Sequence, residues 1–121
     1  MELVFEPRPD HLLVRAVGQF DMQQARQGLE TLARLCQQHG LTRILVDASG
    51  ITSRISIADR YDLATWLASV GSGHMRMAIL VSSKNMFTKT FEDTAANRGI
   101  PVRTTDSLRE ALDYLQLPAP G

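Results

Sequence analysis

The sequence predicts an α/β fold: a mostly parallel five-stranded sheet with an antiparallel first strand, packed with four helices. Short apolar runs alternate with longer stretches of helical periodicity, which is typical of parallel strands joined by helices. The run Ile44, Leu45 and Val46 has no polar alternation, which indicates a central strand covered on both faces. The expected order of elements is β-β-α-β-α-β-α-β-α.

Two strands are expected at the start of the chain, over residues 2–6 and 12–17. Pro7 and Pro9 stop any regular element between them, so the two strands should form an antiparallel hairpin. A helix follows from Asp21, with Gln24 at the capping-box position, and it ends at Gly40. The central strand comes next and completes a right-handed parallel unit.

The second half of the chain repeats this alternation. The central strand is expected to stop at Asp47, and a polar loop should lead to a helix capped by Ser56. A strand over 75–81 and a helix over 86–98 follow, and then an edge strand over 100–103 and a last helix ending at Leu115. We expect one domain over residues 1–121, with 117–121 as a short tail. The predicted buried face of the second helix is Ile57, Tyr61, Ala64, Leu67 and Ala68.

The composition excludes several classes of protein. Lys plus Arg and Asp plus Glu each number 13, so the chain has no basic excess with which to bind nucleic acid. The single cysteine, Cys36, permits no internal disulfide and indicates a reducing compartment. Residues 1–6 do not resemble a signal peptide, and no apolar run is long enough for a membrane span. We therefore expect a cytoplasmic protein.

The chemistry-bearing residues form no recognisable catalytic or metal-binding set. His11, His39 and His74 each precede a strand, so they should lie at the opposite end of the sheet from Asp47 and Ser49. This placement disfavours a Ser-His-Asp site. The glycines match no phosphate-binding or dinucleotide motif, and the histidines and the cysteine lack zinc-site spacing. We expect no cofactor and no metal.

Polar residues are expected to gather at the carboxyl ends of the parallel strands, where ligands and partners meet such sheets. Arg54 and Lys84 could hold an anion there, although loop and helix-start positions favour the same polar residue types without any ligand. Asp47 is expected to accept backbone N–H bonds from the loop. The candidate binding residues are Asp47, Ser49, Gly50, Thr52, Arg54, Ser56 and Lys84.

Several segments resemble a known family. They are Gly18 at the close of the second strand, residues 44–51, residues 78–81, and residues 99–103 followed by 110–115. These segments and the order of elements resemble the STAS domain, the fold of the sporulation anti-sigma-factor antagonist and of the cytoplasmic part of sulfate transporters. The SpoIIAA-like group of small bacterial proteins is the nearer resemblance. It implies a SpoIIAA-like fold and a protein partner.

The antagonists of that family carry an Asp-Ser-Ser-Gly motif at the start of the second helix, and a kinase phosphorylates its second serine. In this chain the motif falls on Ile55, Ser56, Ile57 and Ala58, so the acceptor position has no hydroxyl group. We expect no phosphorylation switch, with Ile57 pointing into the sheet and Ser56 held close to the core. The loop should then act as a fixed surface whose shape depends on Gly50.

These observations favour a non-enzymatic regulatory or protein-interaction module of STAS type. The alternative is a small-molecule or lipid-binding domain of the same fold, because this fold is also likened to phosphatidylinositol-transfer domains. An enzyme is the third possibility, and the sequence shows no catalytic set for it. A protein partner is expected, a small anion or lipid ligand and a homodimer are open alternatives, and nucleic acid is not expected.

Overall fold

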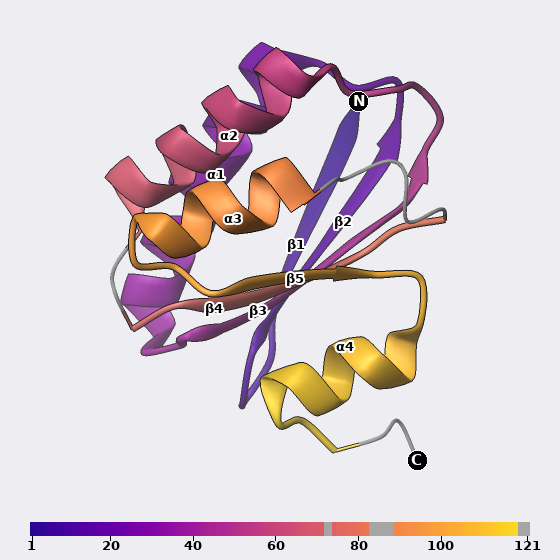
Figure 1. The fold of residues 1–121 in the computed structure, drawn as a ribbon. Helices are drawn as coiled ribbons and strands as arrows, with labels where there is room; N and C mark the ends of the chain where they lie inside the picture. The colour runs from indigo at the N-terminus through magenta and orange to yellow at the C-terminus, as the bar shows by residue number, and fades with distance from the viewer. Residues whose placement is uncertain (72–73, 83–88, 119–121) are drawn as a thin grey trace.

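The computed structural model describes residues 1–71, 74–82 and 89–118, which form one five-stranded sheet with helices on both faces (Figure 1). The strands are β1 (Glu2–Pro7), β2 (Leu12–Gly18), β3 (Arg43–Ile51), β4 (Arg76–Leu80) and β5 (Val102–Thr105). The helices are α1 (Met22–His39), α2 (Ile57–Val70), α3 (Lys89–Asn97) and α4 (Leu108–Leu115). The predicted order of elements is confirmed.

The strands lie in the sheet in the order in which they occur in the chain, β1-β2-β3-β4-β5. β1 is antiparallel to β2, and every later pair is parallel. One row of paired residues crosses the whole sheet: Phe5, Val14, Val46, Ile79 and Thr104. The mixed sheet with an antiparallel first strand is therefore the fold that the sequence predicts.

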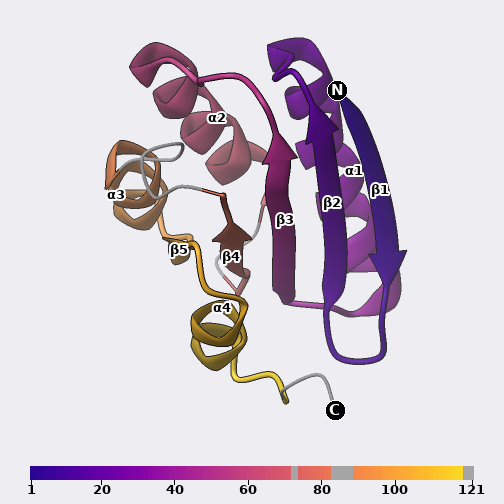
Figure 2. The same ribbon diagram turned by 90° about the vertical axis from the view of Figure 1, so that its right-hand side faces the viewer.

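The two faces of the sheet are covered to different extents. Figure 1 shows α1, α2 and α3 on one side of the sheet and α4 on the other. α4 packs on β3, β4 and β5, and Figure 2 shows the β1–β2 hairpin lying beside α4. Val4, Arg15 and Val17 are exposed on the hairpin.

Two apolar cores follow from this arrangement. Ile44 of β3 belongs to the larger core beneath α1, α2 and α3, whereas its neighbour Leu45 belongs to the smaller core beneath α4. Successive residues of a strand point to opposite faces, so burial on both faces produces the unbroken apolar run in the sequence. Leu117, expected in the tail, is buried in the smaller core.

The helix starts are fixed by local hydrogen bonds. Asp21 accepts from the Gln24 backbone N–H at 2.8 Å, Ser56 from that of Asp59 at 3.1 Å, and Ser107 from that of Glu110 at 3.2 Å. These bonds satisfy N–H groups that have no partner within a helix. Capping by Asp21 and Ser56 is confirmed, and Ser107 caps α4.

Gly28 lies within α1, where glycine weakens a helix unless it serves packing. A Cβ atom at this position would lie 2.7 Å from Leu3 Cδ1, which is far below van der Waals contact. Gly28 therefore allows the edge strand β1 to lie close against α1.

The prediction that the central strand stops at Asp47 is wrong, because β3 continues to Ile51. The paired residues Arg15↔Asp47 and Val17↔Gly50 enclose one more residue in β3 than in β2. This extra residue is a β-bulge, which lets the strand continue through a polar segment. The expected start of the third helix, over residues 86–88, lies outside the described residues.

Candidate functional site

The helix α2 is turned differently from its predicted orientation. The side chains that it buries are Arg60, Leu63, Ala64 and Leu67. Ile57 is 66% exposed and Tyr61 is 48% exposed, whereas Arg60 is only 7% exposed. The prediction that Ile57 points into the sheet is therefore wrong.

The orientation of α2 is set by the residues at its two ends. Ile55, directly before the helix, is buried in the larger core, and the Ser56 cap then starts the helix away from it. At the other end, a Cβ atom on Gly71 would lie 2.8 Å from Ile100 Cδ1, so the chain passes close to Ile100. With both ends fixed, Ile57 and Tyr61 fall on the side that faces solvent.

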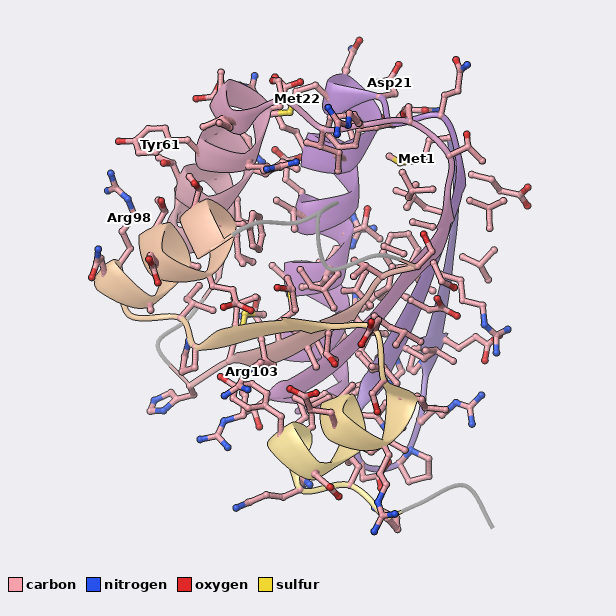
Figure 3. The ribbon with its side chains drawn as sticks, turned by 45° about the vertical axis from the view of Figure 1, so that its right-hand side comes forward. Met1, Asp21, Met22, Tyr61, Arg98 and Arg103 are labelled. Atoms are coloured by element: carbon pink, nitrogen blue, oxygen red, sulfur yellow. The ribbon has the colours of Figure 1, made fainter. Side chains whose placement is uncertain are left out.

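Ile57 and Tyr61 are one helical turn apart, so they share one face of α2. The guanidinium of Arg98, which follows α3, donates a hydrogen bond to Tyr61 Oη at 3.4 Å. Figure 3 shows Tyr61 and Arg98 together on the outer side of α2 and α3. We call the set Ser56, Ile57, Tyr61 and Arg98 the α2 surface. It combines an apolar patch, a helix N-terminus and one cation.

Ser56 is exposed at the start of this surface. Its Oγ accepts the Asp59 backbone N–H, so the hydroxyl group lies at the positive end of the helix dipole. The expectation that Ser56 is held close to the core is therefore wrong, because it assumed that Ile57 was buried. In the structure only Ile55, on the other side of Ser56, is buried.

The segment before α2 is held by bonds to the connection between β2 and α1. The Thr52 N–H donates to Gly18 O at 3.0 Å, and the Phe20 N–H donates to Ser53 Oγ at 2.7 Å. These bonds tie a segment far along the chain to the start of α1. The polar segment that leads to the α2 surface is thus fixed at two points.

Asp47 and Ser49 meet at the bulge in β3. Asp47 Oδ1 accepts the Ser49 backbone N–H at 3.1 Å and the Ser49 Oγ–H at 2.5 Å. The bulge removes Ser49 from regular strand pairing, and the carboxylate supplies an acceptor in its place. The expectation that Asp47 accepts a backbone N–H is confirmed.

Gly50 lies where β3 approaches β2 closely. A Cβ atom on Gly50 would lie 3.1 Å from Val17 Cγ2 and 3.3 Å from Ala16 O, which is tighter than ordinary contact. A side chain at position 50 would press against β2, so the close approach of the two strands depends on the glycine at this position.

The other candidate residues are only partly brought together. Thr52 and Arg54 are exposed beside the fixed segment, and Lys84 lies outside the described residues. The anion site on Arg54 and Lys84 therefore stays a prediction. Sequence reasoning missed Tyr61, Arg60 and Arg98. One signal was present, because Arg60, Leu63, Ala64 and Leu67 also have the spacing of a single helix face.

Two titratable groups outside the α2 surface, Cys36 and Asp10, have pKa values shifted by burial or by a local hydrogen bond. Burial raises the pKa of the Cys36 thiol to about 11, so the neutral thiol is the form present near pH 7. The hydrogen bond between His11 Nδ1 and Asp10 Oδ1, at 2.7 Å, lowers the pKa of the Asp10 carboxyl group. Within the described ranges, His, Cys, Asp and Glu form no group of three or more that could hold a metal ion.

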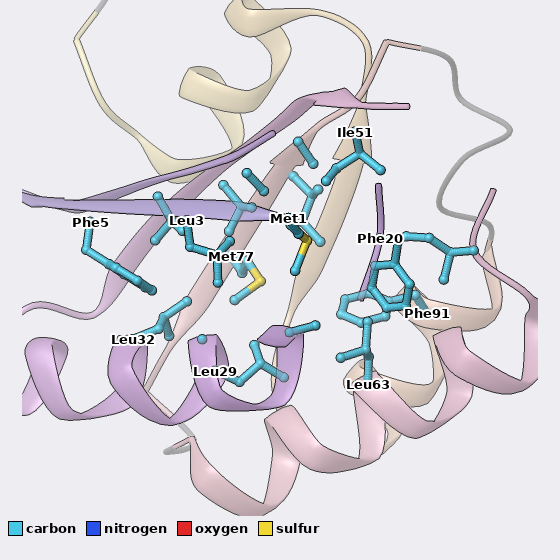
Figure 4. Close-up of a pocket in the computed structure, with 18 residues that line it drawn as sticks. Met1, Leu3, Phe5, Phe20, Leu29, Leu32, Ile51, Leu63, Met77 and Phe91 are labelled. Atoms are coloured by element: carbon cyan, nitrogen blue, oxygen red, sulfur yellow. The ribbon is translucent and has the colours of Figure 1, made fainter. Parts of the chain in front are cut away.

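An apolar cavity lies on the other side of α2, between the sheet and the helices (Figure 4). Its volume is about 90 Å³. In the described part of the chain, the side chains around it are all apolar, and they come from four strands, three helices and their connections. They include Leu3, Leu32, Ala48, Leu63 and Phe91.

Comparison with known proteins gives structural neighbours only. No family model matches the chain, and no curated protein matches its sequence. An anti-sigma factor antagonist from Mycobacterium paratuberculosis has a TM-score of 0.62 at 14% identity, over 95% of this chain and 93% of that one. The anti-sigma factor antagonist SpoIIAA in its unphosphorylated form has a TM-score of 0.57 at 16% identity, over 95% and 96%.

A third neighbour is an uncharacterized protein of the DUF3478 family with a SpoIIAA-like fold, from Shewanella loihica PV-4. Its TM-score is 0.50 at 20% identity, over 94% of this chain and 92% of that one. At these identities the likeness shows a shared fold. Among the described helices, none has the length and apolar character needed to cross a membrane.

Proposed function

The chain has a SpoIIAA-like (STAS) fold, and we propose that it serves as a non-enzymatic regulatory module that binds a protein partner through the α2 surface. The observation that carries this proposal is the orientation of α2. Ile57 and Tyr61 face solvent, while the arginine between them in sequence is turned inward. A fold that leaves two large apolar side chains outside at this position departs from ordinary patterning, and such departures are typical of functional sites.

The chemistry of the α2 surface suits a protein partner. Tyrosine and arginine are enriched among the residues that dominate binding energy at protein interfaces. Tyr61 and Arg98 already bond to each other, so less side-chain freedom is lost on binding. Two of the structural neighbours are named as antagonists of anti-sigma factors, which supports a protein partner for this chain as well.

The candidate residues before α2 are assigned to this function as supports and neighbours of the surface. Asp47, Ser49 and Gly50 stabilise the bulge, Thr52 helps to fix the segment that follows, and Arg54 adds a cation beside the helix start. A segment held in this way presents the surface with little ordering cost on binding.

We also propose that this surface works without the phosphorylation switch of the antagonists. The acceptor position of the family motif is Ile57, which carries no hydroxyl group. Ser56 is exposed, so the proposal rests on the missing acceptor and not on shielding. Incubation with ATP and a lysate of the source cells, followed by mass spectrometry, should leave Ser56 unmodified. Stoichiometric phosphate on Ser56 would restore the switch.

The partner proposal is tested by affinity purification from the source cells with the tagged chain. Ile57→Ser combined with Tyr61→Ser should lose the partner. Val4→Ser is the matched control, because Val4 is 42% exposed on the edge strand β1, outside the segment that leads to α2, and this variant should retain the partner. Once the partner is identified, the double variant should bind at least about tenfold more weakly, as expected for truncating interface anchors. Equal recovery of the partner with the wild type, the double variant and the control variant would refute the α2 surface as the binding site.

A second candidate function, binding of a small molecule or lipid, is favoured by a different observation. The apolar cavity lies on the inner side of α2, and the described side chains that line it are all apolar. Such cavities suit uncharged apolar molecules. This function and the partner function use opposite sides of the same helix.

A further inference from the structure

We infer that the cavity beneath α1 and α2 is a binding site for a small, free, uncharged hydrocarbon molecule. The inference rests on the second of the two proposed functions and names its ligand class. It is independent of the α2 surface, because the residues that line the cavity belong to the inner side of the helix layer.

The lining determines the chemistry of the ligand. Side chains such as Leu29, Leu32, Met77 and Ile79 surround the cavity, and among the described residues that line it, none has a side chain with a hydrogen-bonding or charged group. Water in such a site would lose hydrogen bonds, whereas a hydrocarbon gains dispersion contacts with the lining side chains. A charged ligand group would lose its hydration without compensation. The site therefore selects for uncharged, apolar ligands.

Small residues produce the space. Ala16, Ala25 and Ala48 line the cavity at positions where a larger apolar side chain would reduce its volume. Gly28 also lines it, and there a Cβ atom would collide with Leu3 Cδ1 of β1 at 2.7 Å. The volume of about 90 Å³ is smaller than the roughly 150 Å³ engineered cavity that binds benzene or xenon, so the ligand can be no larger than benzene.

The position of the cavity also provides a route for entry. Met1, Leu3 and Phe5 form one wall, and all three are only partly buried. They belong to the edge strand β1 and the residue before it, and within the described residues β1 pairs with β2 alone. Figure 4 shows these side chains opposite Leu29 and Leu32 of α1. A displacement of the β1 side chains away from α1 would admit a small apolar molecule.

The first test uses xenon as the probe and the methyl NMR signals of the intact chain as the readout. Xenon should shift the signals of Ala48, Leu32 and Met77 in the wild type. Ala48→Leu should abolish these shifts because the larger side chain occupies the cavity. Ala16→Val serves as a second filling variant if Ala48→Leu does not fold. Val17→Leu, on the exposed face of β2, is the control and should behave as the wild type.

The second test compares benzene with benzoate, which differ only in a charged carboxylate. Benzene should raise the melting temperature of the wild type by a few degrees at saturating concentration, and it should not do so in Ala48→Leu. Benzoate should give no shift. The inference fails if xenon shifts no lining signal, if the filling variants respond as the wild type does, or if benzoate stabilises as strongly as benzene. Failure here leaves the partner proposal unaffected, because that proposal is measured at Ile57 and Tyr61.

Discussion

The two sides of α2 are similar in sequence but differ in surroundings. The inner side carries Leu63, Leu67 and an arginine, all buried, whereas the outer side carries Ile57 and Tyr61, both exposed. Apolar residues occur all around this helix, so its own periodicity does not determine which side is buried. The flanking residues Ile55 and Gly71 decide it. The orientation of this helix is therefore a tertiary property, imposed by the chain on either side.

The largest effect is expected on the inner side of α2. Leu67 is fully buried, so Leu67→Ala should lower the free energy of unfolding by about 2–5 kcal/mol through lost burial and the cavity that remains. Urea denaturation measures this difference. Core truncations of this kind cost about 2–5 kcal/mol, so a loss below about 1 kcal/mol would show that α2 does not bury this side.

A smaller effect is expected at the junction between the two sides. Ser56→Ala removes the acceptor of the Asp59 N–H and should cost about 1 kcal/mol. Ser56→Asp keeps an acceptor at the N-cap and should retain most of the stability. Thermal melts of the three proteins measure both effects, and an unchanged Ser56→Ala variant would remove the capping role.

Asp47→Ala tests the segment that leads to α2. The Ser49 N–H loses its acceptor, but Ser49 is exposed and water can replace the carboxylate. The expected loss is therefore about 0.5–1 kcal/mol, less than the penalty for a buried unpaired donor. Asp47→Asn, which keeps an acceptor oxygen, is the control. A loss above about 3 kcal/mol would mean that Asp47 has a buried partner.

The smallest effect on stability is expected on the outer side of α2. Ile57→Ala removes an exposed side chain and should change the free energy of unfolding by less than about 0.5 kcal/mol. The same variant should weaken binding of the protein partner. Chemical denaturation alongside the binding measurement separates the two effects. A stability loss close to that of Leu67→Ala would contradict the comparison.

Sequence reasoning was most accurate where the determinants are local. The caps Asp21 and Ser56 and the C-terminal glycine of α1, Gly40, were predicted because each acts within a few residues of itself. The order of elements along the chain followed from the alternation of apolar runs and helical periodicity. Both predictions use information that lies within a short window of the chain.

The errors arose where tertiary contacts decide the structure. Ala48, Ser49 and Gly50 read as a loop in sequence, but pairing with β2 keeps them in β3. The outward placement of Ile57 depends on the burial of Ile55 and the close approach of Gly71 to Ile100. The cavity arises from the combined size of side chains on many elements, which no single segment specifies.

The order of the strands has a consequence for synthesis of the chain. Each new strand pairs with the strand made just before it, so the sheet can grow at one edge while the polypeptide emerges from the ribosome. The helix α4 is made after all five of these strands, and it covers Leu45 and Ala78 on the second face of the sheet. Until translation reaches α4, that face remains bare and open to chaperones or to aggregation. If a stalled ribosome released the chain before α4 was made, the product would therefore be an aggregation-prone fragment in which most of the sheet had already formed.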